Sequence, residues 1–184
     1  MGYIFLYTGK GEGKTTNALG LALRSVGHKR KVVVIQFLKW RKSIGEYKVK
    51  DQLAPYFEIY QFGRPAWLGE EEKTVSYGGR TFKIEKFKDV DRELAKKALE
   101  FARTVLREKK PHLLVLDEIN LALHWKLLGI KDVLDFLGDI PEETDVVLTG
   151  RYAPDELVEK ADFVSVIEEF KAPREFKAKK GLQY

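Results

Sequence analysis

The sequence contains no cysteine, and this absence excludes several kinds of functional site. Without a thiol, the chain can form no disulfide, no thiolate-bound zinc centre and no cysteine nucleophile. Its three histidines, His28, His112 and His124, are too few for a histidine-rich metal cage. The functional groups must therefore be sought among the other polar residues.

A second absence is that of a long apolar run, since the sequence shows neither a signal peptide nor a membrane-spanning stretch. We therefore expect a soluble, cytoplasmic protein with no membrane partner. Lys and Arg number 33 against 28 Asp and Glu, and this net charge of +5 at pH 7 modestly favours phosphate-bearing ligands. Three lysines near the C-terminus, Lys177, Lys179 and Lys180, are interpreted as a solvated end, so no nucleic-acid partner is expected.

The 184 residues fit one domain spanning 1–184, and an apolar content of 44% suits an ordinary globular core. Short runs that are apolar on both faces alternate with amphipathic stretches along most of the chain. This alternation predicts an α/β fold with a mostly parallel sheet and helices on both faces. We expect strands over residues 4–8, 31–37, 57–62, 113–116, 145–149 and 163–167, and helices over residues 14–26, 90–109, 131–137 and 155–160.

Residues 63–89 interrupt this alternation. Two β-prone runs, 74–77 and 80–84, flank Gly78-Gly79 and predict a hairpin-like insertion with a tight turn. Because long excursions of this kind in α/β domains are usually functional, we expect residues 63–89 to form a lid or a binding loop.

A glycine-rich segment, Gly9-Lys10-Gly11-Glu12-Gly13-Lys14-Thr15-Thr16, joins the first expected strand to the first helix. Glycines let backbone N–H groups approach phosphate oxygens, and the following helix directs its positive end at the anion. Lys14 can then reach the terminal phosphates, and the Thr15 hydroxyl can hold magnesium. The match to the standard P-loop is imperfect, because Thr8 stands where that pattern has its first glycine. A glycine-rich helix cap is the alternative, but the strand–loop–helix context favours nucleotide binding and a P-loop NTPase (RecA-like) architecture.

Polar residues follow two further expected strands. Asp117 and Glu118 end the buried run 113–116, and in P-loop proteins such a strand carries the acid that positions magnesium or its water. Arg151 follows the run 145–149 and is expected at the carboxyl edge of the sheet, where open α/β folds bind ligands. A surface salt bridge is the alternative role for Arg151.

Several longer motifs are far more specific than a P-loop alone. They are Gln36-Phe37-Leu38-Lys39, Asp117-Glu118-Ile119-Asn120-Leu121-Ala122 and, at the end, Lys177-Ala178-Lys179-Lys180-Gly181-Leu182-Gln183-Tyr184. Thr149-Gly150-Arg151 lies between the last two. With the P-loop in front, this order resembles the P-loop type of ATP:corrinoid adenosyltransferase, also called cob(I)alamin adenosyltransferase. The resemblance runs from the first strand to the last residue, except between about Lys42 and Asp89, where the match is poor.

The resemblance implies a reaction of cobalamin biosynthesis, in which a cobalt(I) corrinoid attacks the 5′ carbon of ATP and inorganic triphosphate leaves. It implies catalytic roles for Lys14 and Glu118, magnesium ligation by Thr15 and Glu118, and nucleotide contacts for Arg24 and Arg151. It also implies a homodimer and an electron-donating reductase as a partner. The phosphate cradle that it implies comprises Gly9, Lys10, Gly11, Glu12, Gly13, Lys14, Thr15 and Thr16.

The family often has a Phe-x-Trp pair that helps to expel the lower axial ligand of the corrinoid. Here Pro65 stands in place of the first aromatic residue and Trp67 keeps the second, so Trp67 is expected to contact the corrinoid. Two other functions stay open at this point. One is a P-loop NTPase or small-molecule kinase with another acceptor, and the other is a non-catalytic ATP-binding protein.

Overall fold

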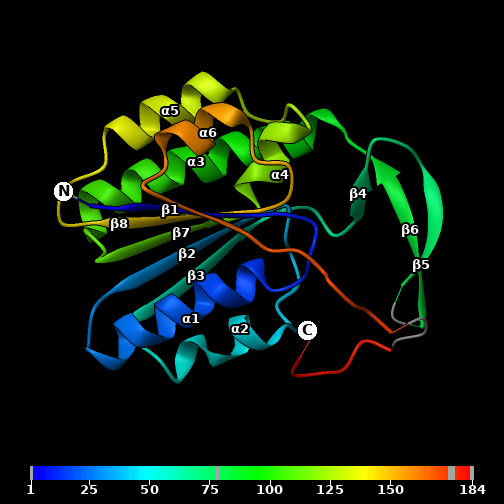
Figure 1. Ribbon diagram of the computed structural model, residues 1–184, viewed down its shortest axis with the longest axis horizontal. Helices are drawn as coiled ribbons and strands as arrows, with labels where there is room; N and C mark the ends of the chain where they lie inside the picture. The colour runs from blue at the N-terminus through cyan, green and yellow to red at the C-terminus, as the bar shows by residue number, and fades with distance from the viewer. Residues whose placement is uncertain (1, 78, 174–176, 183–184) are drawn as a thin grey trace.

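The computed structural model describes residues 2–77, 79–173 and 177–182. Its centre is a six-stranded sheet in which all neighbouring strands run parallel, in the order β3-β2-β7-β8-β1-β9 (Figure 1). All six expected strands are present, so the predicted α/β fold with a parallel sheet is confirmed. The strands are β1 Ile4–Thr8, β2 Val32–Phe37, β3 Phe57–Phe62, β7 Leu113–Asp117, β8 Asp145–Thr149 and β9 Phe163–Val166.

Helices cover both faces of this sheet, with α1 and α2 on one face and α3 to α6 on the other (Figure 1). All six residues of β2 are buried, so both faces of this strand need a helical cover. Ala18 and Ala22 of α1 pack in one core, and Ala98 and Ala102 of α3 pack in a second core across the sheet. Among the described residues, no helix is both long and apolar enough to cross a membrane. The helices are α1 Lys14–Gly27, α2 Gly45–Lys48, the 3-10 helix η1 Val49–Asp51, α3 Asp89–Lys109, α4 Ile119–His124, α5 Ile130–Gly138 and α6 Asp155–Lys160.

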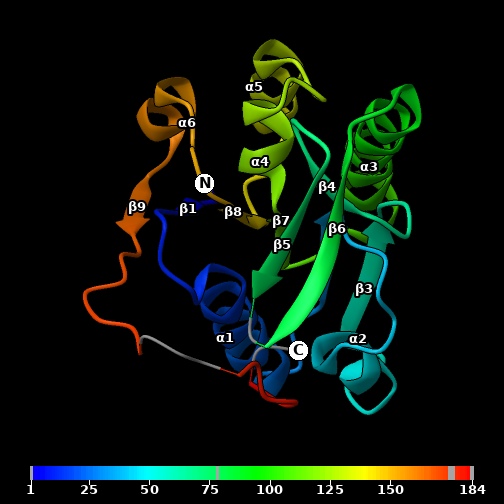
Figure 2. The same cartoon turned by 90° about the vertical axis from the view of Figure 1, so that its right-hand side faces the viewer.

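A second, three-stranded sheet stands beside the carboxyl ends of the main strands (Figure 2). Its strands are β4 Trp67–Gly69, β5 Lys73–Tyr77 and β6 Arg80–Lys86. β5 and β6 pair antiparallel with Tyr77 opposite Arg80, which confirms the predicted hairpin, although Gly78 of its turn lies outside the described residues. β4 pairs parallel with β6, and its three residues are too short a run to be seen in the sequence. A role of residues 63–89 as a lid stays a prediction.

One arginine ties this small sheet to the main domain. The Arg64 guanidinium donates to both carboxylate oxygens of Asp91 at 2.9 and 3.1 Å, to Glu85 at 2.6 Å and to the carbonyl oxygen of Lys86 at 3.1 Å. Asp91 is buried in the first turn of α3, where it also accepts a hydrogen bond from the Lys88 N–H at 2.9 Å. Arg64 therefore joins β6 and the start of α3 just before the chain enters β4.

Candidate active site

The glycine-rich segment forms a loop between β1 and α1, as the sequence predicts. Gly9 and Gly13 both adopt left-handed backbone angles, with φ of 102° and 106°, which glycine adopts without strain. Gly13 caps α1, so the first N–H groups of this helix face the loop. The Thr8 hydroxyl, at the position where the standard motif has glycine, accepts a hydrogen bond from the Ala153 N–H at 3.3 Å. Thr8 therefore connects the loop to the segment that follows β8.

A cavity of about 430 Å³ opens beside this loop. Lys14 and Arg151 both line it, so two cations from distant parts of the sequence meet here, and Leu182 of the C-terminal segment also contributes to the wall. The predicted residues Gly9 and Lys10 are not part of the lining. The loop residues that line the cavity are Gly11, Glu12, Gly13, Lys14, Thr15 and Thr16.

Lys14 is buried, and its ammonium donates a hydrogen bond to the carbonyl oxygen of Gly11. Burial lowers the pKa of Lys14, and the charge of Arg151 lowers it further, whereas the carboxylates of Glu118 and Glu12 act in the opposite direction. An anion that enters between Lys14 and Arg151 would relieve the repulsion between these two cations. The pair is therefore arranged as a receptor for negative charge.

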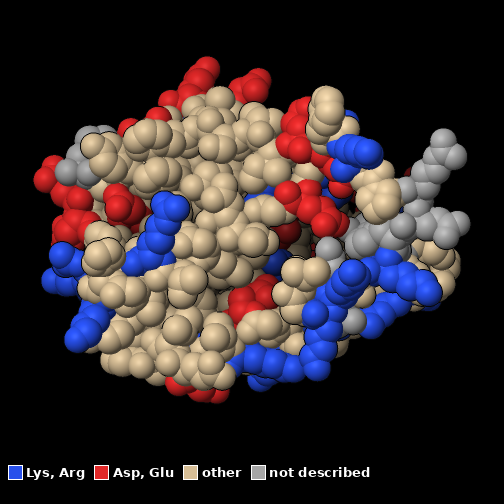
Figure 3. Space-filling model, turned by 60° about the horizontal axis from the view of Figure 1, so that its bottom comes forward, with Lys and Arg blue, Asp and Glu red and all other residues tan. Residues whose placement is uncertain are grey.

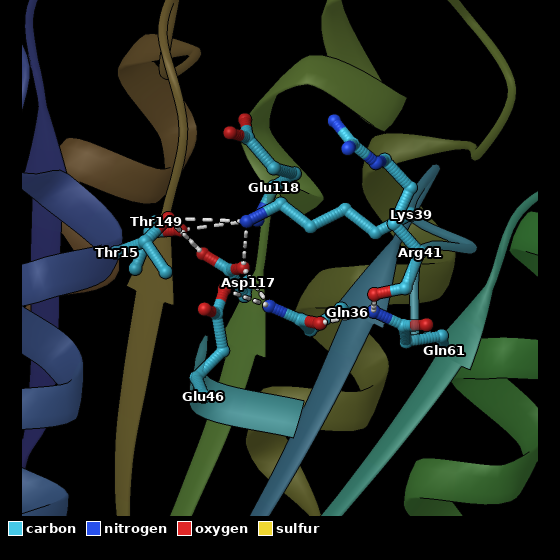
Figure 4. A network of polar contacts seen from close by, with 9 residues as sticks. All are labelled: Thr15, Gln36, Lys39, Arg41, Glu46, Gln61, Asp117, Glu118 and Thr149. Atoms are coloured by element: carbon cyan, nitrogen blue, oxygen red, sulfur yellow. Dashed lines mark hydrogen bonds and ion pairs between the residues drawn. The ribbon is translucent and has the colours of Figure 1, made fainter. Parts of the chain in front are cut away.

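Asp117 is the central acid of the site, at the end of β7 (Figure 4). Its carboxylate is fully buried and accepts hydrogen bonds from the hydroxyls of Thr15 and Thr149, both at 2.7 Å, and from Lys39 at 2.7 Å. Burial alone would raise the pKa of Asp117, but the Lys39 ammonium and these hydrogen bonds hold the pKa below its usual range. Asp117 is therefore an ionised, oriented carboxylate that contacts the P-loop threonine directly.

Glu118 lies one residue further and lines the same cavity. Its backbone is left-handed, with φ of 67°, and its N–H donates to the Thr149 hydroxyl at 3.0 Å. This conformation turns the Glu118 side chain away from that of Asp117 (Figure 4). Burial raises the pKa of Glu118 and the Asp117 charge adds to the rise, while Lys39, Lys14 and Arg151 oppose it. The Oε2 atom is buried and has no hydrogen-bond partner among the described residues.

Polar residues from β2 and the segment after it complete the network, and sequence reasoning gave them no role. The Gln36 amide donates to Asp117 at 3.0 Å and to Glu46 at 3.5 Å, and its oxygen accepts a hydrogen bond from Gln61 at 2.9 Å. A signal for Gln36 was available, because it is the one polar residue in an otherwise apolar strand that is buried throughout. Lys39 follows in the same motif.

A second cavity, of about 290 Å³, adjoins the first. Its walls include Trp40, Trp67 and Trp125, which are all three tryptophans of the sequence. Glu118, Leu121 and Trp125 line both cavities, so these residues form the boundary between a polar and a largely apolar space. The Trp67 ring packs edge-on against Trp40 at 5.3 Å and against Phe82 of the hairpin at 4.9 Å.

The structure thus brings most of the predicted site residues to one edge of the sheet. Thr15 and Glu118 both line the first cavity, beside the glycine-rich loop, but the Thr15 hydroxyl bonds to Asp117 and not to Glu118. Trp67 lies in the adjoining cavity. Arg24 is exposed on the last turn of α1, and among the described residues it lines neither of the two cavities described above. A nucleotide contact by Arg24 stays a prediction.

With this geometry in place, a comparison with protein families decides the assignment. The model of the family described as ATP:corrinoid adenosyltransferase BtuR/CobO/CobP matches residues 1–184. The chain belongs to this family. The resemblance seen in the sequence and the enzyme class that it implies, an ATP:corrinoid adenosyltransferase, are both confirmed.

Individual relatives agree with the family assignment. Corrinoid adenosyltransferases of Sinorhizobium sp, Escherichia coli (strain K12) and Pseudomonas aeruginosa are 34%, 29% and 33% identical to this chain. Each alignment covers 100% of this chain, and 80%, 86% and 84% of the respective relatives. Among solved structures, the KaiC-like protein PH0186 of Pyrococcus horikoshii OT3 matches 91% of this chain and 71% of its own, with a TM-score of 0.53 at 15% identity. That likeness supports the RecA-like P-loop fold alone.

Proposed function

We propose that this member of the family joins the 5′-deoxyadenosyl group of ATP to the cobalt(I) of a corrinoid where the two cavities meet. The observation that carries the proposal is their shared wall of Glu118, Leu121 and Trp125. The polar cavity, with Lys14 and Arg151, suits a triphosphate, and the cavity of three tryptophans suits a large, flat, apolar ring. Adjoining cavities would hold the two reactants next to each other, which is the main task of an enzyme whose nucleophile is the substrate's own metal.

In this proposal the Co–C bond forms with the electron pair of cobalt(I) while the bond from C5′ to the triphosphate oxygen breaks. Negative charge then grows on the leaving triphosphate. Lys14, Arg151 and the N–H groups at the start of α1 face that charge, so they stabilise the transition state electrostatically. Lys and Arg side chains also gather on the right-hand side in Figure 3, toward the hairpin and the C-terminal segment, and they would favour the approach of a polyanion.

Magnesium is part of the proposal, and the residues at the site fit it. Thr15, Asp117 and Glu118 offer only oxygen donors, which magnesium prefers. Glu118 has a buried oxygen without a partner among the described residues. The described residues contain no group of three or more His, Asp or Glu side chains arranged as a metal cluster, so the nucleotide itself would supply further ligands. Thr15, Asp117 and Glu118 would hold the ion beside the P-loop, where it would neutralise phosphate charge.

The remaining expectations belong to the same proposal. They are a homodimer, an electron-donating reductase that supplies cobalt(I), a cytoplasmic location and residues 63–89 as a lid over the corrinoid. The apolar cavity supports the last of these, because Trp67 comes from β4 and packs against Phe82 of β6.

The products of the reaction test the proposed function directly. With ATP, Mg²⁺ and a chemically reduced corrinoid, we expect inorganic triphosphate and an adenosylated corrinoid in equal amounts. ADP with phosphate would point to hydrolysis or kinase chemistry. Tight ATP binding without turnover would point to a non-catalytic ATP-binding protein.

Trp67 is predicted to act in reduction of the corrinoid more than in transfer of the adenosyl group. In this prediction the Trp67 ring excludes water and the lower axial ligand from cobalt. Trp67→Ala should therefore slow the reaction several-fold when cobalt(II) and a mild reductant are supplied. The effect should be much smaller when cobalt(I) is generated beforehand, and Trp67→Phe should restore most of the loss. Rates of both assays, with melting temperatures of all three proteins, check this. Equal losses in both assays that follow a drop in melting temperature would show that Trp67 only stabilises the small sheet.

A further inference from the structure

The Lys39 ammonium lies between the P-loop threonine and the buried acid of the site. Its Nζ lies 2.7 Å from Oδ2 of Asp117 and 3.4 Å from Oγ1 of Thr15, two of the oxygens that surround the proposed magnesium position (Figure 4). Thr15 in turn donates to the other carboxylate oxygen of Asp117 at 2.7 Å. The ammonium thus stands against the P-loop hydroxyl and the buried acid at the same time.

The backbone before Lys39 is built to put the side chain there. Leu38 has a φ of 61°, a left-handed conformation that costs a branched residue energy and persists only where the surroundings enforce it. The surroundings here include Gly63, since a Cβ on Gly63 would lie 2.5 Å from the carbonyl carbon of Leu38 and 2.7 Å from the N atom of Lys39. The close approach of β3's end therefore fixes the point from which the Lys39 side chain starts.

Three nearby carboxylates stabilise the charged form of the Lys39 side chain. Burial alone would lower the pKa of Lys39, but the carboxylates of Asp117, Glu118 and Glu46 raise it above its usual value. A full positive charge is therefore present between the P-loop and β7. A divalent cation bound to the oxygens of Thr15 and Asp117 would be brought into contact with this charge, and like charges at that distance repel strongly in a buried site.

We propose that the Lys39 ammonium is a resident cation that holds the Thr15–Asp117 position in the absence of a divalent ion, and that it must move away when that ion binds. This inference rests on the proposed function. Lys39 already lines the adjoining cavity of Trp40, Trp67 and Trp125, so its side chain has space to move into on that side. Binding of the metal beside the nucleotide would then also change the wall of the second cavity, because the Lys39 side chain would move into it.

Binding of Mn²⁺ to the nucleotide-free protein tests the competition without any need for catalysis. The free Mn²⁺ signal in electron paramagnetic resonance gives the affinity of wild type, Lys39→Met and Lys42→Met. We expect Lys39→Met to bind Mn²⁺ at least tenfold more tightly than wild type, because no ammonium then competes for the oxygens of Thr15 and Asp117. Lys42 is exposed and lies three residues away, so Lys42→Met should bind as wild type does. Equal affinities of Lys39→Met and wild type would overturn the inference.

A second measurement uses the wild-type protein and so does not depend on a variant that folds. Lysines are labelled with a small acylating reagent with and without saturating Mn²⁺, and labelling is quantified for each residue by mass spectrometry. Displacement from Asp117 should increase the labelling of Lys39 at least threefold, with Lys42 unchanged as the internal control. Unchanged labelling of Lys39 while Mn²⁺ is bound would overturn the inference and leave the proposed metal role intact. If Mn²⁺ fails to bind even with ATP present, both the inference and that metal role are wrong.

Discussion

Replacement of Lys14 by alanine is expected to lower kcat about 10²–10³-fold, because the leaving triphosphate loses one of the two cations, Lys14 and Arg151, that line the cavity. A preorganised electrostatic contact in a buried site is worth about 3–4 kcal/mol in the transition state. Lys14 meets the conditions for that value, since it is buried and faces the polar cavity together with Arg151. Arg151 remains in the variant, which is why some activity should persist.

The measurement for Lys14 is the initial rate of triphosphate release with cobalt(I) supplied in excess. Lys97→Ala is a suitable control, since Lys97 is an exposed lysine of α3 that lies outside the lining of both active-site cavities. The control should keep wild-type activity, and both variants should keep the wild-type melting temperature to within a few degrees. Activity of Lys14→Ala within a factor of two of wild type would contradict the assignment of the P-loop.

The main sheet could be predicted from the sequence because its strands must be apolar on both faces. Residues 32–37 and 113–117 lie in the middle of the sheet with helices on both sides, and they are apolar except for Gln36 and Asp117 near their carboxyl ends. The small sheet is harder to predict from the sequence, because its strands are largely exposed and lack an apolar pattern. Only the hairpin turn is marked by a clear local sequence pattern. The helix Ile119–His124 was missed because six residues give too little periodicity to see.

For the site, the sequence predicts which residues take part but not which of them form hydrogen bonds with one another. Sequence motifs locate residues on loops, and in the structure Lys14, Thr15, Glu118 and Arg151 line one cavity, while their roles stay predictions. The motifs do not show which carboxylate meets which hydroxyl. Thr15 bonds to Asp117 because the end of β7 lies beside the P-loop, and that neighbourhood arises only from the strand order. The position of the Lys39 side chain depends on the left-handed backbone of Leu38, and no local sequence pattern predicts that conformation.

A second large effect is expected for Arg64→Met, which should lower the free energy of unfolding by about 3 kcal/mol. The variant leaves Asp91 as a buried carboxylate without its main partner, and breaking a buried ion pair from one side typically costs about 3–5 kcal/mol. In a chain of this size, that loss corresponds to roughly 6–12 °C in melting temperature. Chemical denaturation and thermal melting of the variant check the value.

The chain offers a matched control for Arg64→Met in a second Arg–Asp pair of similar geometry. The Nη1 atom of Arg103 lies 2.8 Å from Asp139, compared with 2.9 Å between Nε of Arg64 and Asp91, but the Asp139 side chain is 70% exposed and that of Asp91 is 1% exposed. Arg103→Met should therefore change stability by no more than about 1 kcal/mol. Arg64→Met should also raise the KM for the corrinoid with little change in the KM for ATP, since Arg64 anchors the strands that carry Trp67 and Phe82. If both variants lose the same stability, or if the two KM values of Arg64→Met rise together, the anchoring role of Arg64 is wrong.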